Sequence, residues 1–250
     1  MRYLITFKYD GTNYSGYQKQ PNAVTIQGEL ESVLTKINSN KQVIVSASGR
    51  TDAHVHALGQ RAHFDLDISI LSNDLKRALN SLLPSDIYVT NVEEVSSDFH
   101  ARFDVKSKEY MYIINVGEYN PIERNHVYQY NKTLNIDDIE KAISYLVGEH
   151  DFRSFTKVDE EKDDYVRTIN EIKVNFNSES NYLTINFIGT GFLRYMVRNM
   201  VGTLIEIGEG KRTPESIIEL LELKDRTKAG KTAPPEGLYL KNVMYQNTCC

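Results

Sequence analysis

The sequence contains no tryptophan, only two cysteines, and no apolar run long enough to cross a bilayer. A membrane-spanning helix needs about 20 apolar residues, so we expect no membrane segment. The N-terminus reaches Lys8 and Asp10 too soon for a signal peptide, which favours a cytoplasmic protein. The cysteines, Cys249 and Cys250, are adjacent at the chain end, where they predict neither a disulfide framework nor a zinc site.

An excess of charge of one sign is also lacking, because the formal net charge is only −5 over 250 residues. A nonspecific nucleic-acid binder usually carries a basic face, and this composition counts against one. Arginines gathered in one place would still permit specific binding. With 40% hydrophobic and 25% charged residues, the chain is typical of a soluble globular protein of one large or two smaller domains.

Apolar periodicity predicts the order β-α-β-β-α-β twice along the chain. In the first half we expect strands at 2–9, 43–47, 57–66 and 87–95 and helices at 25–38 and 71–83. In the second half we expect strands at 107–116, 166–177, 182–188 and 238–245, helices at 136–147 and 193–207, and an extra helix at 214–223. The sequence therefore predicts an α+β protein with two ferredoxin-like halves, residues 1–104 and 105–250, whose sheets join around a central cleft.

Residues 46–60, S-A-S-G-R-T-D-A-H-V-H-A-L-G-Q, form an unusually charged connection between two predicted strands. Ordinary hairpins close with Asn-Gly or Asp-Gly. Here Arg50, Asp52, His54 and His56 alternate, which indicates a functional site on a loop held by a rigid scaffold. Arg50 and Asp52 would point the same way in an extended segment. By spacing alone, Asp52 could equally be an Asx-turn residue that caps the loop.

Five blocks of the sequence resemble the tRNA pseudouridine synthase A family. They are D-G-T-N-Y-S-G-Y-Q-K-Q at 10–20, G-R-T-D-A-H-V-H-A at 49–57, F-H-A-R-F-D-V-K-S-K-E-Y-M-Y at 99–112, G-T-G-F-L-R-Y-M-V-R-N-M-V-G at 189–202 and P-P-E-G-L-Y-L at 234–240. They occur in the family's order and cover nearly the whole chain. No single block is decisive, but together they are highly specific.

The resemblance implies an isomerase that converts uridine to pseudouridine in the anticodon stem-loop of tRNA, at positions 38, 39 and 40. The N1–C1′ bond breaks, the base turns, and C5 bonds to C1′. Because the reaction involves neither redox change nor net hydrolysis, we expect no cofactor and no metal. It also implies a homodimer, with one tRNA contacting both subunits. Such chemistry needs a shielded carboxylate, a ring to stack on the extruded base, and donors to hold it.

Within the matched blocks, the resemblance implies that Asp52 is the catalytic carboxylate. A carboxylate can attack C1′, attack C6, or deprotonate the sugar to give a glycal, and all three routes stay open. Four residues are implied to bind the substrate: Arg50 during base flipping, Tyr110 by stacking on the uracil, Arg198 by pairing with Asp52, and Leu238 beneath the uracil.

Each of these residues also has a simpler structural interpretation. A tyrosine at strand spacing is often a core residue, which we favour for Tyr112, the nearest rival of Tyr110. An arginine on a helix often faces solvent, which we favour for Arg194 over Arg198. An arginine beside an apolar helix face should be ion-paired, because an unpaired buried charge is costly.

His54 departs from the family, which usually has glycine at that position. We expect its ring to face solvent or the edge of the RNA site and to have no catalytic part. A metal site of His54, His56 and His63 is conceivable by alternation, but the chemistry requires none. Further RNA-facing groups are expected among residues 10–20 and at Arg61, Arg102, Lys106 and Lys108, since a stem is recognised mainly by shape.

Two other classes of function remain open. A catalytically silent RNA-binding or chaperone module on the same fold would bind tRNA without isomerising it, and His54 is its best support. A carboxylate-dependent nucleoside glycosidase would need a second acidic residue as proton donor. The matched blocks supply arginines and a tyrosine instead, which ranks this alternative low.

Overall fold

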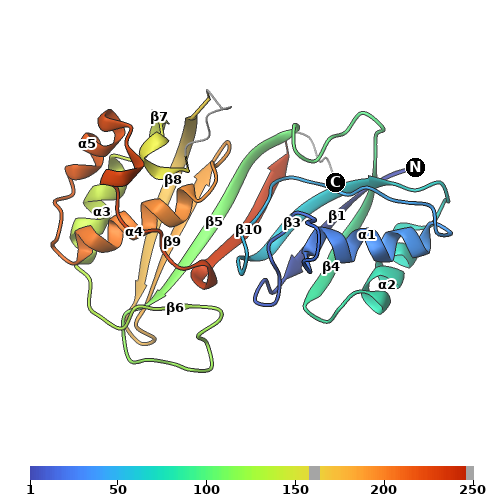
Figure 1. The fold of residues 1–250 in the computed structure, drawn as a ribbon, viewed down its shortest axis with the longest axis horizontal. Coiled ribbons are helices and arrows are strands. Elements are labelled where there is room, and N and C mark those ends of the chain that lie inside the picture. The colour runs from blue at the N-terminus through green and yellow to red at the C-terminus, as the bar shows by residue number, and fades with distance from the viewer. Residues whose placement is uncertain (158–163, 246–250) are drawn as a thin grey trace. The chain divides into compact units, whose positions relative to one another are not determined.

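The computed structural model describes residues 1–157 and 164–245, which form an α+β protein as expected. The chain divides into two compact units (Figure 1). The first consists of Met1–Lys106 with Tyr239–Cys250, and the second of Ser107–Leu238. Most of the acidic run D-E-E-K-D-D at 159–164 and both cysteines lie outside the described residues. Among the described helices, none is long and apolar enough to cross a membrane.

The first unit contains a sheet with two helices packed beside it (Figure 1). Its elements are β1 (Arg2–Tyr9), α1 (Ile26–Ile37), β2 (Ser46–Ala47), β3 (His56–Asp65), α2 (Ser72–Leu82), β4 (Ile87–Val95) and most of β10 (Leu238–Tyr245). The antiparallel order β4-β1-β3-β2 is that of the predicted split βαβ pattern. β10 pairs in parallel with the start of β3, where Tyr239 lies opposite His56.

Local sequence explains α1. The side chain of Thr25 caps it by accepting a hydrogen bond from the Gly28 N–H at 3.3 Å. Ile26, Leu30 and Leu34 recur at helical spacing and are buried. The predicted helix and its start are thus confirmed.

The second unit contains an antiparallel sheet in the order β5-β9-β8-β7. Its elements are β5 (Val105–Asn115), β6 (Tyr128–Gln129), α3 (Ile136–Ser144), β7 (Gly148–Asp151), η1 (Arg153–Phe155), β8 (Val166–Asn177), β9 (Tyr182–Gly189), α4 (Met196–Gly208), α5 (Ser216–Leu223), η2 (Arg226–Lys228) and η3 (Pro235–Gly237). Asn135 caps α3 by accepting a hydrogen bond from the Asp138 N–H at 3.3 Å.

Four elements differ from the sequence prediction. The predicted strand at 43–47 shrinks to β2, because the Val45 N–H donates to the Glu31 carboxylate of α1. Residues 148–151, which follow the helix predicted at 136–147 and were not expected to form a strand, form edge strand β7 on β8. Helix α4 begins three residues late, at Met196, because Tyr195 has a left-handed backbone with φ 61°. The last strand, expected in the second half, has an additional neighbour in β3 of the first unit.

A histidine inside the first sheet predicts a pH-dependent stability. His63 is buried, and its Nδ1 accepts a hydrogen bond from the Ala101 N–H at 3.1 Å. Burial, followed by the neighbouring His100 and Arg2, lowers the pKa of His63 from 6.5 to about 4. The fold therefore favours the neutral ring, and the resulting contribution to the free energy of unfolding is complete above pH 6.5.

As pH falls from 6.5 to 4, the unfolded chain takes up this proton before the folded chain does. We expect the His63 contribution to unfolding free energy to fall by at most about 1.4 kcal/mol per pH unit, and by less where solvent screens the ring. An NMR titration of the ring should place its midpoint near pH 4. A midpoint near 6.5 would contradict the burial argument.

Candidate active site

The loop that carries Arg50 and Asp52 runs from β2 to β3 and is anchored at its start by a buried glutamine. Gln60 has no exposed surface, although it lies in the middle of β3. Its Oε1 accepts from the Ser48 hydroxyl at 2.7 Å, and its Nε2 donates to the Gly49 carbonyl at 3.0 Å. A buried side-chain amide must be satisfied in this way, so Gln60 fixes the loop backbone directly before Arg50.

Thr51 anchors the middle of the loop. It is buried, its hydroxyl lies 2.7 Å from that of Tyr9, and its carbonyl accepts from the Tyr17 N–H at 3.1 Å. Burial raises the pKa of Tyr9 to about 12, so its hydroxyl stays protonated at neutral pH. Because the Thr51 side chain points inward, the residues on either side of it lie nearer the surface: Arg50 is exposed and Asp52 is half-buried.

The first loop, residues 10–17, lies directly against the end of this loop. The His54 N–H donates to the Tyr14 carbonyl at 3.3 Å, and a Cβ on Gly11 would lie 2.1 Å from the Val55 carbonyl oxygen. Gly16 has φ 98°, and a Cβ there would meet the Thr51 carbonyl oxygen at 3.0 Å. Two glycines thus allow the backbone approach that sets the position of Asp52.

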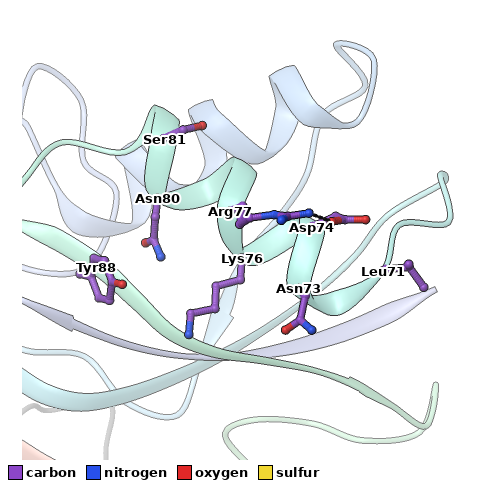
Figure 2. Close-up of a pocket in the computed structure, with 8 residues that line it drawn as sticks. All are labelled: Leu71, Asn73, Asp74, Lys76, Arg77, Asn80, Ser81 and Tyr88. Atoms are coloured by element: carbon purple, nitrogen blue, oxygen red, sulfur yellow. Dashed lines mark hydrogen bonds and ion pairs between the residues drawn. The ribbon is translucent and has the colours of Figure 1, made fainter.

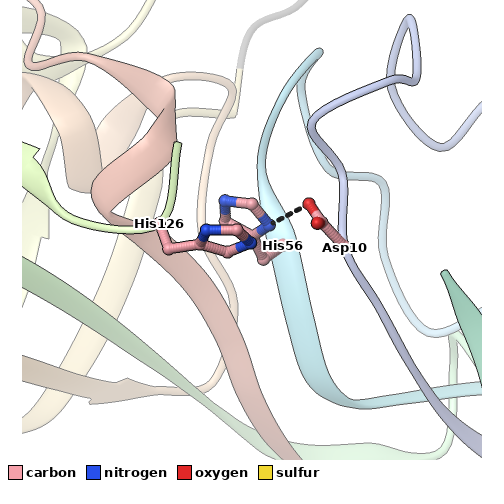
Figure 3. A group of neighbouring side chains, drawn as sticks. All are labelled: Asp10, His56 and His126. Atoms are coloured by element: carbon pink, nitrogen blue, oxygen red, sulfur yellow. Dashed lines mark ion pairs between the residues drawn. The ribbon is translucent and has the colours of Figure 1, made fainter. Parts of the chain in front are cut away.

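His56 ties these two loops together from β3. Its Nδ1 accepts from the Gly11 N–H at 3.0 Å and lies 3.1 Å from the Asp10 carboxylate (Figure 3). Its ring stacks on Tyr239 with centroids 4.8 Å apart. His54 and His63 have other partners, the carbonyl of Thr12 and the N–H of Ala101. The three histidines considered as a metal site therefore hold separate parts of the backbone.

The ring of His54 is exposed, as expected for a residue outside the chemistry. Its backbone is left-handed, with φ 64°, which accounts for the glycine usual at this position. Its Nδ1 lies 2.8 Å from the Thr12 carbonyl oxygen, a contact that glycine cannot make. Compared with glycine, His54 therefore adopts the left-handed backbone less readily but gains a hydrogen bond to the first loop.

This exchange predicts a stability order among variants of His54. His54→Ala keeps the left-handed backbone and loses the hydrogen bond, so it should cost about 1–2 kcal/mol. His54→Gly relieves the backbone and should stay within about 1 kcal/mol of the parent. Both should keep enzymatic rates within about threefold, measured beside urea unfolding. A large loss of rate in His54→Gly would mean that the imidazole takes part in the reaction.

Tyr110 lies in the second unit, on β5 opposite Phe187 of β9. It is buried, and its ring meets Phe192 edge-on with centroids 5.0 Å apart. Its rival Tyr112 is fully buried, and its hydroxyl donates to the Pro234 carbonyl at 2.7 Å. Burial raises the pKa of Tyr112 well above 10. Tyr112 is thus a core residue, as the sequence favoured.

Arg198 projects from α4 and is fixed by the segment that precedes η3. Its Nε donates to the Ala233 carbonyl at 2.7 Å, and its own carbonyl accepts from the Ala233 N–H at 3.0 Å. Arg194, one turn earlier, is exposed as expected. Leu238 is buried where β10 begins. The predicted ion pair between Arg198 and Asp52 stays a prediction.

Two features lie outside the predicted site. Arg61, expected to face RNA, is ion-paired with Glu93 and covers the ring of Tyr245, so this expectation is not supported. A hollow of about 840 Å³ lies beside α2 and β4 (Figure 2). It is lined by Leu71, Asn73, Asp74, Lys76, Arg77, Asn80, Ser81 and Tyr88. None of these is a predicted site residue, so the hollow adds nothing to the chemistry.

The anchoring residues were missed by sequence reasoning. Tyr9 and Gln60 lie on strands β1 and β3. The only sequence signal for them is a polar side chain at a strand position that alternation assigns to the buried face, close to the charged loop. Their partners, Thr51 and Gly49, are 42 and 11 residues away, which no local pattern reveals.

Comparison with known proteins bears on both units. A family model described as tRNA pseudouridine synthase matches residues 5–104 and 142–246. The chain belongs to the tRNA pseudouridine synthase family. The family assignment made from the five blocks is therefore confirmed.

Curated relatives match this family member over nearly their whole length. A tRNA pseudouridine synthase A of Anoxybacillus flavithermus is 48% identical, with 98% of this chain and 99% of the relative covered. Relatives of the same name from a Geobacillus strain and Streptococcus sanguinis are 46% and 44% identical, again covering 98% of this chain and 99% of each relative.

Likeness to solved structures is much weaker. A chain in a crystal structure of a Cbf5-Nop10-Gar1 complex matches with a TM-score of 0.36 and 11% identity. The match covers 81% of this chain and 54% of that one. A likeness at this level supports no argument about the fold or the site.

Proposed function

We propose that this chain converts uridine to pseudouridine in the anticodon stem-loop of tRNA, at positions 38, 39 and 40. The observation that carries the proposal is the family match, which spans both units and includes the G-R-T-D block at 49–52. Support comes from the anchored loop that presents Asp52 half-buried between a fixed Thr51 and the first loop.

The reaction is balanced without any external reagent. The N1–C1′ bond of uridine breaks, C5 bonds to C1′, C5 loses its proton, and N1 gains one. Asp52 supplies the carboxylate, by addition to C1′ or C6 or by deprotonation of the sugar. Because its loop is held before and after it, the carboxylate needs little reorganisation in the transition state.

In this proposal, four other residues hold the same nucleotide. Arg50, exposed and next to an anchored threonine, assists as the base leaves the stack. Tyr110 stacks on the uracil, Leu238 lies beneath it, and Arg198 pairs with the catalytic carboxylate. The stem itself is bound through its backbone and shape, as expected for an RNA duplex. The protein acts in the cytoplasm as a homodimer on tRNA.

Release of tritium from C5 tests the proposal directly. Purified protein is incubated with a tRNA transcript in which every uridine, including those at 38, 39 and 40, is [5-³H]uridine, and the control transcript is labelled in the same way but carries cytidine at these three positions. We expect tritium in water and pseudouridine in the first RNA only. Tight binding without release would mean a silent RNA-binding protein, and free uracil would mean a glycosidase.

A further inference from the structure

We propose that Tyr195 is a positioning residue that orients the Arg198 guanidinium toward the substrate. This inference rests on the proposed function, in which Arg198 acts at the catalytic carboxylate. It starts from a local conflict between residue type and backbone. Tyr195 has φ 61° and ψ 1° immediately before α4, a conformation that bulky side chains rarely adopt.

The chain around Tyr195 holds this backbone in place. The Thr156 hydroxyl donates to the Arg194 carbonyl at 2.9 Å, directly before Tyr195. The Met196 N–H donates to the Leu193 carbonyl at 3.1 Å, and the Asn199 N–H donates to that of Tyr195 at 2.9 Å. A strained residue persists only where its surroundings over-determine it, and such residues concentrate at functional sites.

The ring of Tyr195 explains why a large side chain stands in a position suited to glycine. The guanidinium carbon of Arg198 lies over this ring, 5.5 Å from its centroid. That of Arg194 lies 4.9 Å from the same centroid, and its Nη2 donates to the Tyr195 hydroxyl at 3.0 Å. Cations are attracted to the face of an aromatic ring, so the ring restricts the plane in which the Arg198 guanidinium can turn.

The second restraint on Arg198 is the Ala233 carbonyl, and it too is fixed. Asn199 is buried, and its Oδ1 accepts from the Thr232 hydroxyl at 2.7 Å and from Arg226 at 2.8 Å. A Cβ on Gly202 would lie 1.6 Å from the Lys231 carbonyl oxygen, so this segment passes directly across α4. The Nε of Arg198 is thus held by the segment at Ala233, and the face of its guanidinium is held by Tyr195. Together these two contacts fix the direction in which the guanidinium points.

Four variants separate the ring from the backbone strain. Tyr195→Ala and Tyr195→Gly both remove the ring, and each should lower kcat about tenfold with tRNA affinity within about twofold. Tyr195→Phe keeps the ring and should restore kcat to within about threefold. Stability should divide the variants differently: Tyr195→Gly relieves the left-handed backbone and should melt about 2–4 °C above Tyr195→Ala.

Lys224 provides a matched control, because it is also left-handed, with φ 54°, at the end of α5. Lys224→Gly should likewise melt above Lys224→Ala, and both should keep the parental kcat. This control shows that relief of backbone strain by itself does not change the rate.

A double-mutant comparison tests whether the ring acts through Arg198. In an Arg198→Ala background, Tyr195→Ala should cause no further loss of kcat, since the group that it orients is gone. Losses that multiply would overturn the positioning role, as would parental kcat in Tyr195→Gly or a Tyr195→Phe variant as slow as Tyr195→Ala.

A readout independent of catalysis separates this inference from the proposed function. The Nη–H groups of Arg198, which belong to the part of the guanidinium that lies over the ring, should be protected from solvent exchange in ¹⁵N-labelled parent and Tyr195→Phe, and should lose that protection in Tyr195→Ala. If protection follows this order while the parent makes no pseudouridine, the proposed function fails and the positioning contact stands. Unchanged protection in Tyr195→Ala would overturn the inference.

Discussion

Replacing Asp52 with asparagine should abolish pseudouridine formation while leaving tRNA binding intact. Asparagine has nearly the same shape but cannot act as a nucleophile or base, so we expect kcat to fall by at least about 10³-fold. The anchors of the loop involve Thr51, Gln60 and Tyr9 and do not depend on the charge at position 52. The fold and the dissociation constant for tRNA should therefore stay close to those of the parent.

Tritium release under single-turnover conditions measures this loss, with binding followed separately by filter retention. Asp67→Asn is the matched control: this exposed aspartate pairs with Lys41 and should tolerate loss of its charge without change in rate. Asp52→Asn with a parental rate would exclude Asp52 as the catalytic carboxylate. Loss of binding together with activity would show that the substitution damages the loop.

Gly11→Ala should displace the catalytic loop from the side of the first loop. The added Cβ would lie 2.1 Å from the Val55 carbonyl oxygen, a backbone atom that cannot rotate away. We expect a loss of unfolding free energy of about 1–3 kcal/mol from this overpacking. Because Val55 follows Asp52 by three residues, a shift near 1 Å should also lower kcat about 10²-fold.

Urea unfolding and single-turnover rates of the same preparation test both parts. Gly191→Ala is the control for stability, since its Cβ would meet nothing nearer than the Arg167 side chain at 3.7 Å. It should stay within about 1 kcal/mol of the parent. A Gly11→Ala protein with parental stability and rate would refute the close approach of the two loops.

Local sequence patterns predicted those parts of the fold that local forces determine. Helices α1 and α3 were predicted from apolar spacing, and each begins directly after a side chain, Thr25 or Asn135, that satisfies one of its first N–H groups. The order β4-β1-β3-β2 follows from alternating strands and short connections. The site residues came from motif resemblance, because spacing alone left Asp52 equally compatible with a turn cap.

Features that depend on distant partners were not predicted. The parallel pairing of β10 with β3 joins residues about 180 positions apart, beyond the reach of periodicity. Arg61 was expected at the RNA, but its partners Glu93 and Tyr245 come from two other strands. The left-handed Tyr195 could not be predicted because tyrosine carries no turn signal, and α4 consequently begins later than its apolar pattern suggests.

The central claim is that this chain makes pseudouridine in the anticodon stem-loop with Asp52 as its carboxylate. Its most direct test is to map pseudouridine in tRNA from a strain that lacks the gene and is complemented with the parent or with Asp52→Asn. We expect pseudouridine at positions 38, 39 and 40 with the parent and unmodified uridine with the variant. The same modification in both strains, or in neither, would contradict the account.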